Sequence, residues 1–219
     1  MSLNIKLMPL LFVPLIFFFL ANAKQRIEYS IASAATVFCA GLPYLLQDPV
    51  YIAHRVLGYN GAYGVWGFSC LLRLFSPELD GINTLFQQQG KTLLFAIVLL
   101  YSVWINRLRN KPGLMRQSAL LMLLFFTVTP GFGLQYLVWL APLVLPLEIV
   151  AIVSLYATAT LLLSVRYQIL WAWSSFHTLP SVLLNQLYIS SGIVRWLVIA
   201  ICFLRETWNV TRENRIALQ

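Results

Sequence analysis

About seven apolar runs, separated by connectors that carry much of the charge, constrain this chain more than any other feature. Hydrophobic residues make up 60% of the sequence and charged residues only 10%, whereas an average soluble domain has about 25% charged residues. A whole chain so poor in charge is typical of proteins whose solvent is lipid. The sequence therefore predicts an all-α fold, a polytopic transmembrane helical bundle that forms a single domain over residues 1–219.

A helix needs roughly 17–25 mostly apolar residues to cross a bilayer. The clearest candidate spans are Leu7–Ala23, Tyr29–Leu46 and Leu147–Val165. Shorter candidates, which interfacial residues or neighbouring helices must complete, are Thr92–Ile105, Gln117–Val128, Leu134–Leu145 and Gly192–Leu204. Pro142 and Pro146 divide the stretch after Leu134 into two elements, because proline breaks a helix interior. The first run also resembles a cleavable signal peptide, and we favour a retained span because further apolar runs follow it.

The orientation follows from the connector at residues 106–116, which contains Arg107, Arg109, Lys111 and Arg116 and no acid. Short loops rich in Lys and Arg stay in the cytoplasm. Counting spans from this loop, the connector with Lys24 and Arg26 and the tail at residues 205–219 are also cytoplasmic. The N-terminus is then outside. The predicted location is the plasma membrane, which in bacteria is the inner membrane. The cations are scattered among the connectors, which indicates contact with membrane lipids and excludes nucleic acid as a partner.

The opposite side of the membrane receives the loop at residues 47–91 and the segment at residues 166–191. The long loop is too rich in apolar and aromatic residues to extend into water, so we expect short interfacial helices in it. His54 and Arg55 lie in this loop, and their side chains suit a phosphate group. The alternative is an interfacial helix whose cations meet lipid headgroups. Tyr59, in the same loop, is a further candidate for substrate binding.

The stretch TPGFGLQYLVWLAPLVLP, residues 129–146, places Gln135 and Tyr136 at the outer mouth of a predicted span. An amide and a phenol there could hydrogen-bond a sugar, and an aromatic ring can stack on its face; the alternative is an aromatic belt at a helix start. Arg195 lies near the outer end of the last span, where a charge must snorkel, pair or face a cavity. We favour snorkelling to the surface over a role in phosphate binding.

Three stretches carry a resemblance to a known family, namely KLMPLLFVPLIFFFL, GYNGAYGVWGFSCLLRLF and TPGFGLQYLVWLAPLVLP. Together they resemble the C-terminal half of GT-C-type integral membrane glycosyltransferases that use polyprenyl-phosphate sugars. More distantly, the chain is similar to the GPI mannosyltransferase that adds the first mannose. In that family a Gln-Tyr-x-x-Trp-x-x-Pro pattern opens a late span. Its counterpart here is Gln135, Tyr136, Trp139 and Pro142.

The resemblance implies transfer of a hexose, such as mannose, from a polyprenyl-phosphate donor on the extracytoplasmic face. The family's acidic motif in the first outer loop has no counterpart, since Asp48, Glu78 and Asp80 lie in a different setting. The catalytic residue is therefore unassigned, and we expect the chain to act as the donor-binding part beside a missing N-terminal half or a split subunit. No cofactor or metal ligand set is indicated, although an inverting transfer can use a divalent metal at the leaving phosphate. The alternatives are a transporter or lipid flippase subunit and a non-catalytic membrane scaffold.

Overall fold

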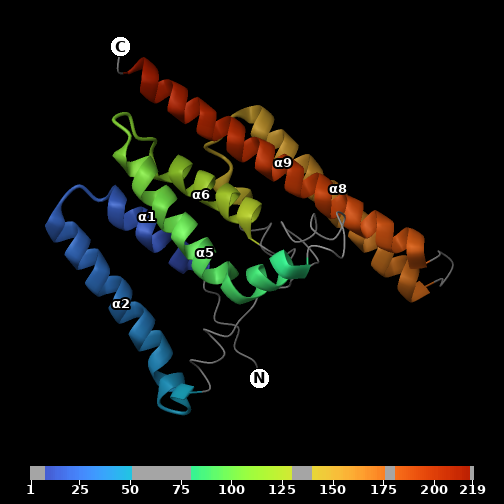
Figure 1. The fold of residues 1–219 in the computed structure, drawn as a ribbon, viewed down its shortest axis with the longest axis horizontal. Coiled ribbons are helices and arrows are strands. Elements are labelled where there is room, and N and C mark those ends of the chain that lie inside the picture. Colours follow the sequence, from blue (N-terminus) through green and yellow to red (C-terminus); the bar gives the residue numbers. More distant parts are fainter. Residues whose placement is uncertain (1–7, 51–79, 130–139, 176–180, 218–219) are drawn as a thin grey trace.

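The computed structural model describes residues 8–50, 80–129, 140–175 and 181–217, and all of their regular secondary structure is helical. The predicted all-α fold is thus confirmed for these residues. In chain order the elements are η1 (Met8–Leu11), α1 (Phe12–Phe19), α2 (Ala23–Leu45), α5 (Asp80–Arg107), α6 (Leu114–Val128), α8 (Ile149–Ser175) and α9 (Ser181–Ile216) (Figure 1).

Prolines and extended residues set several of the helix ends. Gly113, with ψ of 154°, precedes α6, and the residue after that helix, Thr129, is extended with ψ of 135°. Thr129 is followed in the sequence by proline, which disfavours a helical conformation in the residue before it. Between Pro142 and Ile149 the chain turns before α8 begins, so the predicted division at this point is present in the structure.

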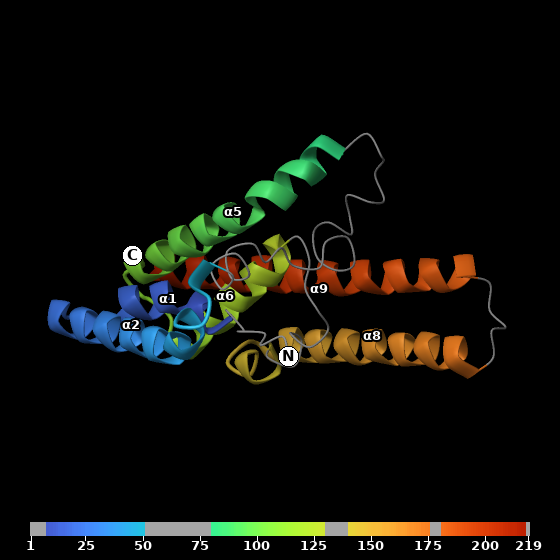
Figure 2. The same cartoon turned by 90° about the horizontal axis from the view of Figure 1, so that it is seen from below.

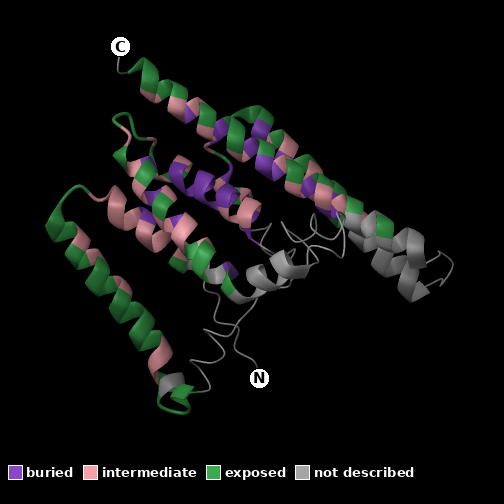
Figure 3. Ribbon diagram, viewed as in Figure 1, coloured by how far each residue is buried: buried purple, intermediate pink, exposed green. Residues whose placement is uncertain are grey.

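The short helix α6 lies at the centre of the fold and is buried along most of its length (Figure 3). One side of it joins α8 and α9 in an apolar cluster that includes Met122, Phe126 and Leu155. The other side joins α1, α5 and the end of α9 in a second cluster around Leu15 and Leu120. A helix that is apolar on both sides has to be enclosed by neighbours, which explains why the other helices are arranged around α6.

The remaining helices pack around this centre unequally. Helices α8 and α9 run antiparallel side by side, and the C-terminal half of α9 continues along α6 (Figure 2). Helix α2 meets the rest of the structure near its start, beside α1, and most of its side chains are exposed (Figure 3). The fold is therefore a packed group of α1, α5, α6 and α9, with α8 beside α9 and α2 extending outward.

Several predicted boundaries need correction. Helix α5 begins at Asp80, inside the range expected to be outer loop, and α8 and α9 together extend through most of residues 166–191. The expected tail at 205–219 continues α9 as far as Ile216. The first predicted run is divided, since α1 ends at Phe19 and α2 begins at Ala23. Charged residues end an apolar run but not a helix, because Arg, Lys, Gln and Glu have high helix propensity.

In the described part of the chain, none of the helices combines the length and the apolar character required for crossing a bilayer.

Candidate functional site

The five residues predicted to bind substrate lie outside the described residues. They are His54, Arg55, Tyr59, Gln135 and Tyr136. The described chain resumes on either side of the segment with Gln135 and Tyr136, at Thr129 and at Leu140. Both flanking residues are buried, with Thr129 at the end of α6 and Leu140 in the cluster shared with α8 and α9. The groups around these two anchor points are therefore the described part of the candidate site.

Arg195 is the main charged group in this region. Its side chain is buried on α9, at 2% exposure, and its Nη1 donates hydrogen bonds to the backbone oxygen of Leu155 and to Oγ1 of Thr158 on α8. The Arg195–Thr158 bond measures 2.6 Å. The interpretation that Arg195 snorkels to the surface is therefore wrong. The reason is that α9 begins well before the predicted span, so Arg195 lies within a long helix and finds its acceptors on α8.

The charge of Arg195 is not balanced by a carboxylate among the described residues, because none of their ion pairs includes it. Its buried Nε also lacks a hydrogen-bond partner within the part of the chain that the structure describes. A buried guanidinium without a counter-charge is costly. The arrangement is suited to an anion such as a phosphate, which Arg binds with paired donors.

Trp196, the residue after Arg195 on α9, connects α9 to the end of α6. The indole Nε1 of Trp196 donates to the backbone oxygen of Thr127 at 2.9 Å. This carbonyl belongs to the last turn of α6, where backbone oxygens have no partner within the helix. The hydrogen bond holds α9 beside the point from which the chain leads into residues 130–139. We call Arg195, Trp196, Thr158 and Thr127 the Arg195 site.

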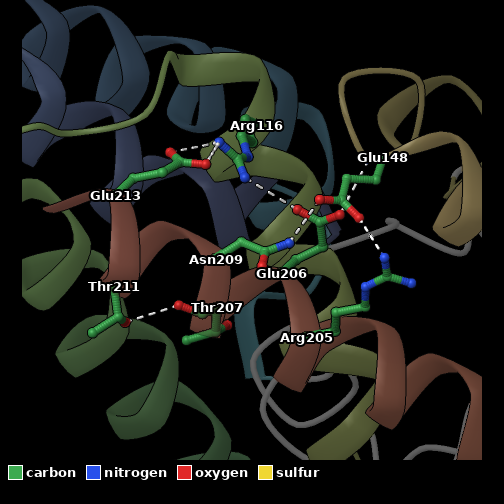
Figure 4. Close-up of polar contacts among 8 residues, drawn as sticks. All are labelled: Arg116, Glu148, Arg205, Glu206, Thr207, Asn209, Thr211 and Glu213. Atoms are coloured by element: carbon green, nitrogen blue, oxygen red, sulfur yellow. Dashed lines mark hydrogen bonds and ion pairs between the residues drawn. The ribbon is translucent and has the colours of Figure 1, made fainter. Parts of the chain in front are cut away.

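A second polar cluster joins the starts of α6 and α8 to the C-terminal half of α9 (Figure 4). Its centre is Glu206, whose side chain has 0% exposure. Its Oε2 accepts a hydrogen bond from Nη2 of Arg116 at 3.3 Å, and its Oε1 accepts one from the backbone N–H of Glu148 at 3.1 Å. The carboxylate thus satisfies a donor at the N-terminal end of α8, where a negative charge is stabilising.

Further ion pairs surround Glu206. Arg116 also donates from Nη1 to both carboxylate oxygens of Glu213, at 3.1 and 3.0 Å. The carboxylate of Glu148 pairs with Arg205 at 2.8 Å and accepts a hydrogen bond from Asn209 at 2.9 Å. We call these six residues the Glu206 network; they are Arg116, Glu148, Arg205, Glu206, Asn209 and Glu213. Each of the three acids is paired with an arginine, with Arg116 shared by Glu206 and Glu213, so the network fastens α6, α8 and α9 together.

Glu206 and Glu213 were not predicted from the sequence to be important residues. A signal was present, because Ile199, Cys202, Glu206 and Val210 recur at helical spacing on one face of α9 and all four are buried. An acid that interrupts such an apolar face indicates a buried partner. This signal was hidden because residues 205–219 were predicted to form a tail rather than part of a helix.

The described residues do not include a group of three or more His, Cys, Asp or Glu side chains arranged to hold a metal ion.

Comparison with known proteins adds no relationship, since neither a protein-family model nor a curated protein nor a solved structure matches this chain significantly.

Proposed function

We propose that this chain is a polytopic membrane protein and the donor-binding part of a lipid-linked-sugar glycosyltransferase. The membrane part of the proposal is supported by the distribution of apolar side chains. Helices α8 and α9 expose many large hydrophobic residues, among them Val153, Leu161, Ile201 and Leu204. The same structure buries Arg195, Glu206 and Gln117. Polar groups inside and large apolar groups outside form the arrangement expected of a protein surrounded by lipid.

The positions of the cationic connectors support the proposed orientation. In the loop between α5 and α6, Lys111 Nζ donates to the backbone oxygen of Phe19 at 3.1 Å, and the backbone N–H of Asn110 donates to Asn214 Oδ1 at 3.0 Å. The end of α1, this loop and the end of α9 therefore meet at one end of the structure. Cations from three connectors thus lie at the same end of the structure, which favours a cytoplasmic location for that end.

The observation that carries the donor-binding part of the proposal is the unbalanced guanidinium of Arg195. It lies one residue from Trp196, which is bonded to the end of α6, just before the segment that contains Gln135 and Tyr136. A polyprenyl-phosphate sugar needs a cation for its phosphate and hydrogen-bonding groups for its sugar. Arg195 supplies the first, and Gln135 and Tyr136 are proposed to supply the second. Transfer then takes place on the extracytoplasmic side.

The test measures hexose transfer from a polyprenyl-phosphate mannose donor in membranes that contain the chain, with and without a co-expressed partner that supplies an acidic outer loop. Transfer is expected only with the partner. The double variant Gln135→Ala, Tyr136→Phe is expected to lower it by about 100-fold, as for loss of groups that stabilise a transition state. Gln186→Ala, a change at an exposed residue on α9, serves as the control.

Two results would contradict this function. One is equal transfer by the double variant and by the Gln186→Ala control. The other is ion-dependent flux through the chain in proteoliposomes without any transfer activity, which would support the transporter alternative instead.

A further inference from the structure

One face of α9 changes character along its length. Its exposed residues follow each other at helical spacing, first large and apolar, then tryptophan, then arginine. They are Val194, Leu197, Ile201, Leu204, Trp208, Arg212 and Arg215. Trp208 is 64% exposed. Tryptophan is enriched where the hydrocarbon layer meets the headgroups, and arginine reaches beyond that level. This order is therefore expected of a helix that passes from the hydrocarbon layer into the headgroup region at Trp208.

Helix α5 repeats the pattern and runs toward the same end of the structure (Figure 1). Leu93 and Leu100 are exposed, Trp104 follows at 37% exposure, and Arg107 is exposed at the end of the helix. The two helices arrive at this arrangement from unrelated stretches of sequence. The repeated order is thus evidence for a common environment along both helices.

A hydrogen bond joins the loop that follows α5 to the last turns of α9. The backbone N–H of Asn110 donates to Asn214 Oδ1 at 3.0 Å. The contact therefore places Arg109, next to Asn110, near the arginines that flank Asn214.

The exposed arginines that follow Trp104 and Trp208 in the sequence have no counter-charge in the described part of the chain. Its ion pairs assign Glu148 to Arg205, and both Glu206 and Glu213 to Arg116. None of these ion pairs includes the exposed residues Arg107, Arg109, Arg212 and Arg215. Like charges held close together are unfavourable unless an anion lies between or near them.

We propose that Arg109, Arg212 and Arg215, with Trp208 beside them, form a binding site for the headgroup of an anionic phospholipid. The proposal rests on the membrane part of the proposed function and not on sugar transfer. A phospholipid fits because its phosphate meets the arginines while its acyl chains lie along the apolar track from Val194 to Leu204. A soluble phosphate would use only the arginines and would leave that track uncovered.

The test uses the full chain purified in a neutral detergent, with bound lipid counted by native mass spectrometry and Trp fluorescence as a second readout. The probes are dioctanoyl phosphatidylglycerol, dioctanoyl phosphatidylcholine and inorganic phosphate. A basic residue near an anionic membrane surface contributes about fivefold in affinity. The variant Arg212→Gln, Arg215→Gln is therefore expected to bind phosphatidylglycerol ~25-fold more weakly than the parent chain. Arg212→Lys, Arg215→Lys keeps the charge and most of the affinity.

Lys24→Gln is the location control, because it removes an exposed cation from α2, and it should leave binding unchanged. Equal affinity for phosphatidylglycerol and phosphatidylcholine overturns the proposal, and so does full affinity in the double glutamine variant. Inorganic phosphate that competes at the same concentration as phosphatidylglycerol overturns the lipid assignment. A separate carbonate wash of membranes distinguishes the two proposals: a chain that is extracted contradicts membrane insertion, whereas a retained chain without lipid preference contradicts only the headgroup site.

Discussion

Replacing Glu206 by alanine is expected to lower the midpoint of thermal unfolding by about 10 °C. The side chain of Glu206 is fully buried and holds both the guanidinium of Arg116 and the backbone N–H of Glu148. Removing one partner of a buried ion pair costs about 3–5 kcal/mol. We expect the lower end of this range, because Arg116 keeps its pair with Glu213 while the backbone N–H of Glu148 loses its acceptor. In a chain of this size 1 kcal/mol shifts the midpoint by about 2–4 °C. Circular dichroism of the purified protein in a neutral detergent measures the shift.

The control for this prediction removes the other acid that binds the same arginine. The side chain of Glu213 is 49% exposed, and it contacts Arg116 at 3.0 Å. An ion pair with an exposed partner contributes about 0–1 kcal/mol, so Glu213→Ala should shift the midpoint by no more than ~4 °C. Shifts of equal size in the two variants would show that burial of Glu206 is not what makes the network important.

Replacing Arg195 by methionine is expected to abolish most sugar transfer while leaving the fold at least as stable. Methionine is apolar and long enough to fill much of the same space. Exchange of a buried charged group for a hydrophobic one is often neutral or stabilising. Because Arg195 is proposed to bind the leaving phosphate, its loss should lower transfer by about 100-fold or more. The measurement compares transfer with the thermal midpoint in the same preparations.

Arg205→Met provides a matched control on the same helix. Arg205 is 48% exposed and binds Glu148 in the Glu206 network, away from the Arg195 site. Its loss should cost a small amount of stability and leave transfer close to that of the parent chain. If Arg195→Met is destabilised in proportion to its loss of transfer, Arg195 is a structural residue, and the donor-binding proposal loses its main support.

The sequence was enough to predict that the chain is helical and that its cationic connectors lie at one end. Apolar runs and low charge correctly predicted helices, and Pro142 and Pro146 correctly predicted the break before α8. Helix lengths were less predictable. A predicted span ends at charged residues, because these are costly to transfer into lipid. A helix, in contrast, continues through any residue with good helix propensity, including charged ones. For this reason α8 continues past Val165 and α9 continues past Arg205.

Side-chain partners could not be read from the sequence in the same way. Arg195 was expected to reach the surface, but its acceptors, Leu155 and Thr158, lie far away in the sequence and come close only when α8 packs on α9. The pairing of Arg116 with Glu206 has the same origin, since their separation in sequence is large. Local patterns predict which residues share a helix face, but not which neighbouring helix that face will contact.

The most direct test of the account is the side of the membrane on which each end of α9 lies. Gly113→Cys and Gln186→Cys, each in a background without the native cysteines, place one thiol at the cationic end and one on the N-terminal part of α9. A side chain at Gly113 meets no atom within 4 Å, and Gln186 is exposed. We predict that a membrane-impermeant maleimide added to intact cells labels Gln186→Cys and spares Gly113→Cys until the cells are lysed. Labelling of both positions in intact cells, or of Gly113→Cys alone, would contradict the proposed orientation, and with it the proposal of a sugar site on the extracytoplasmic side.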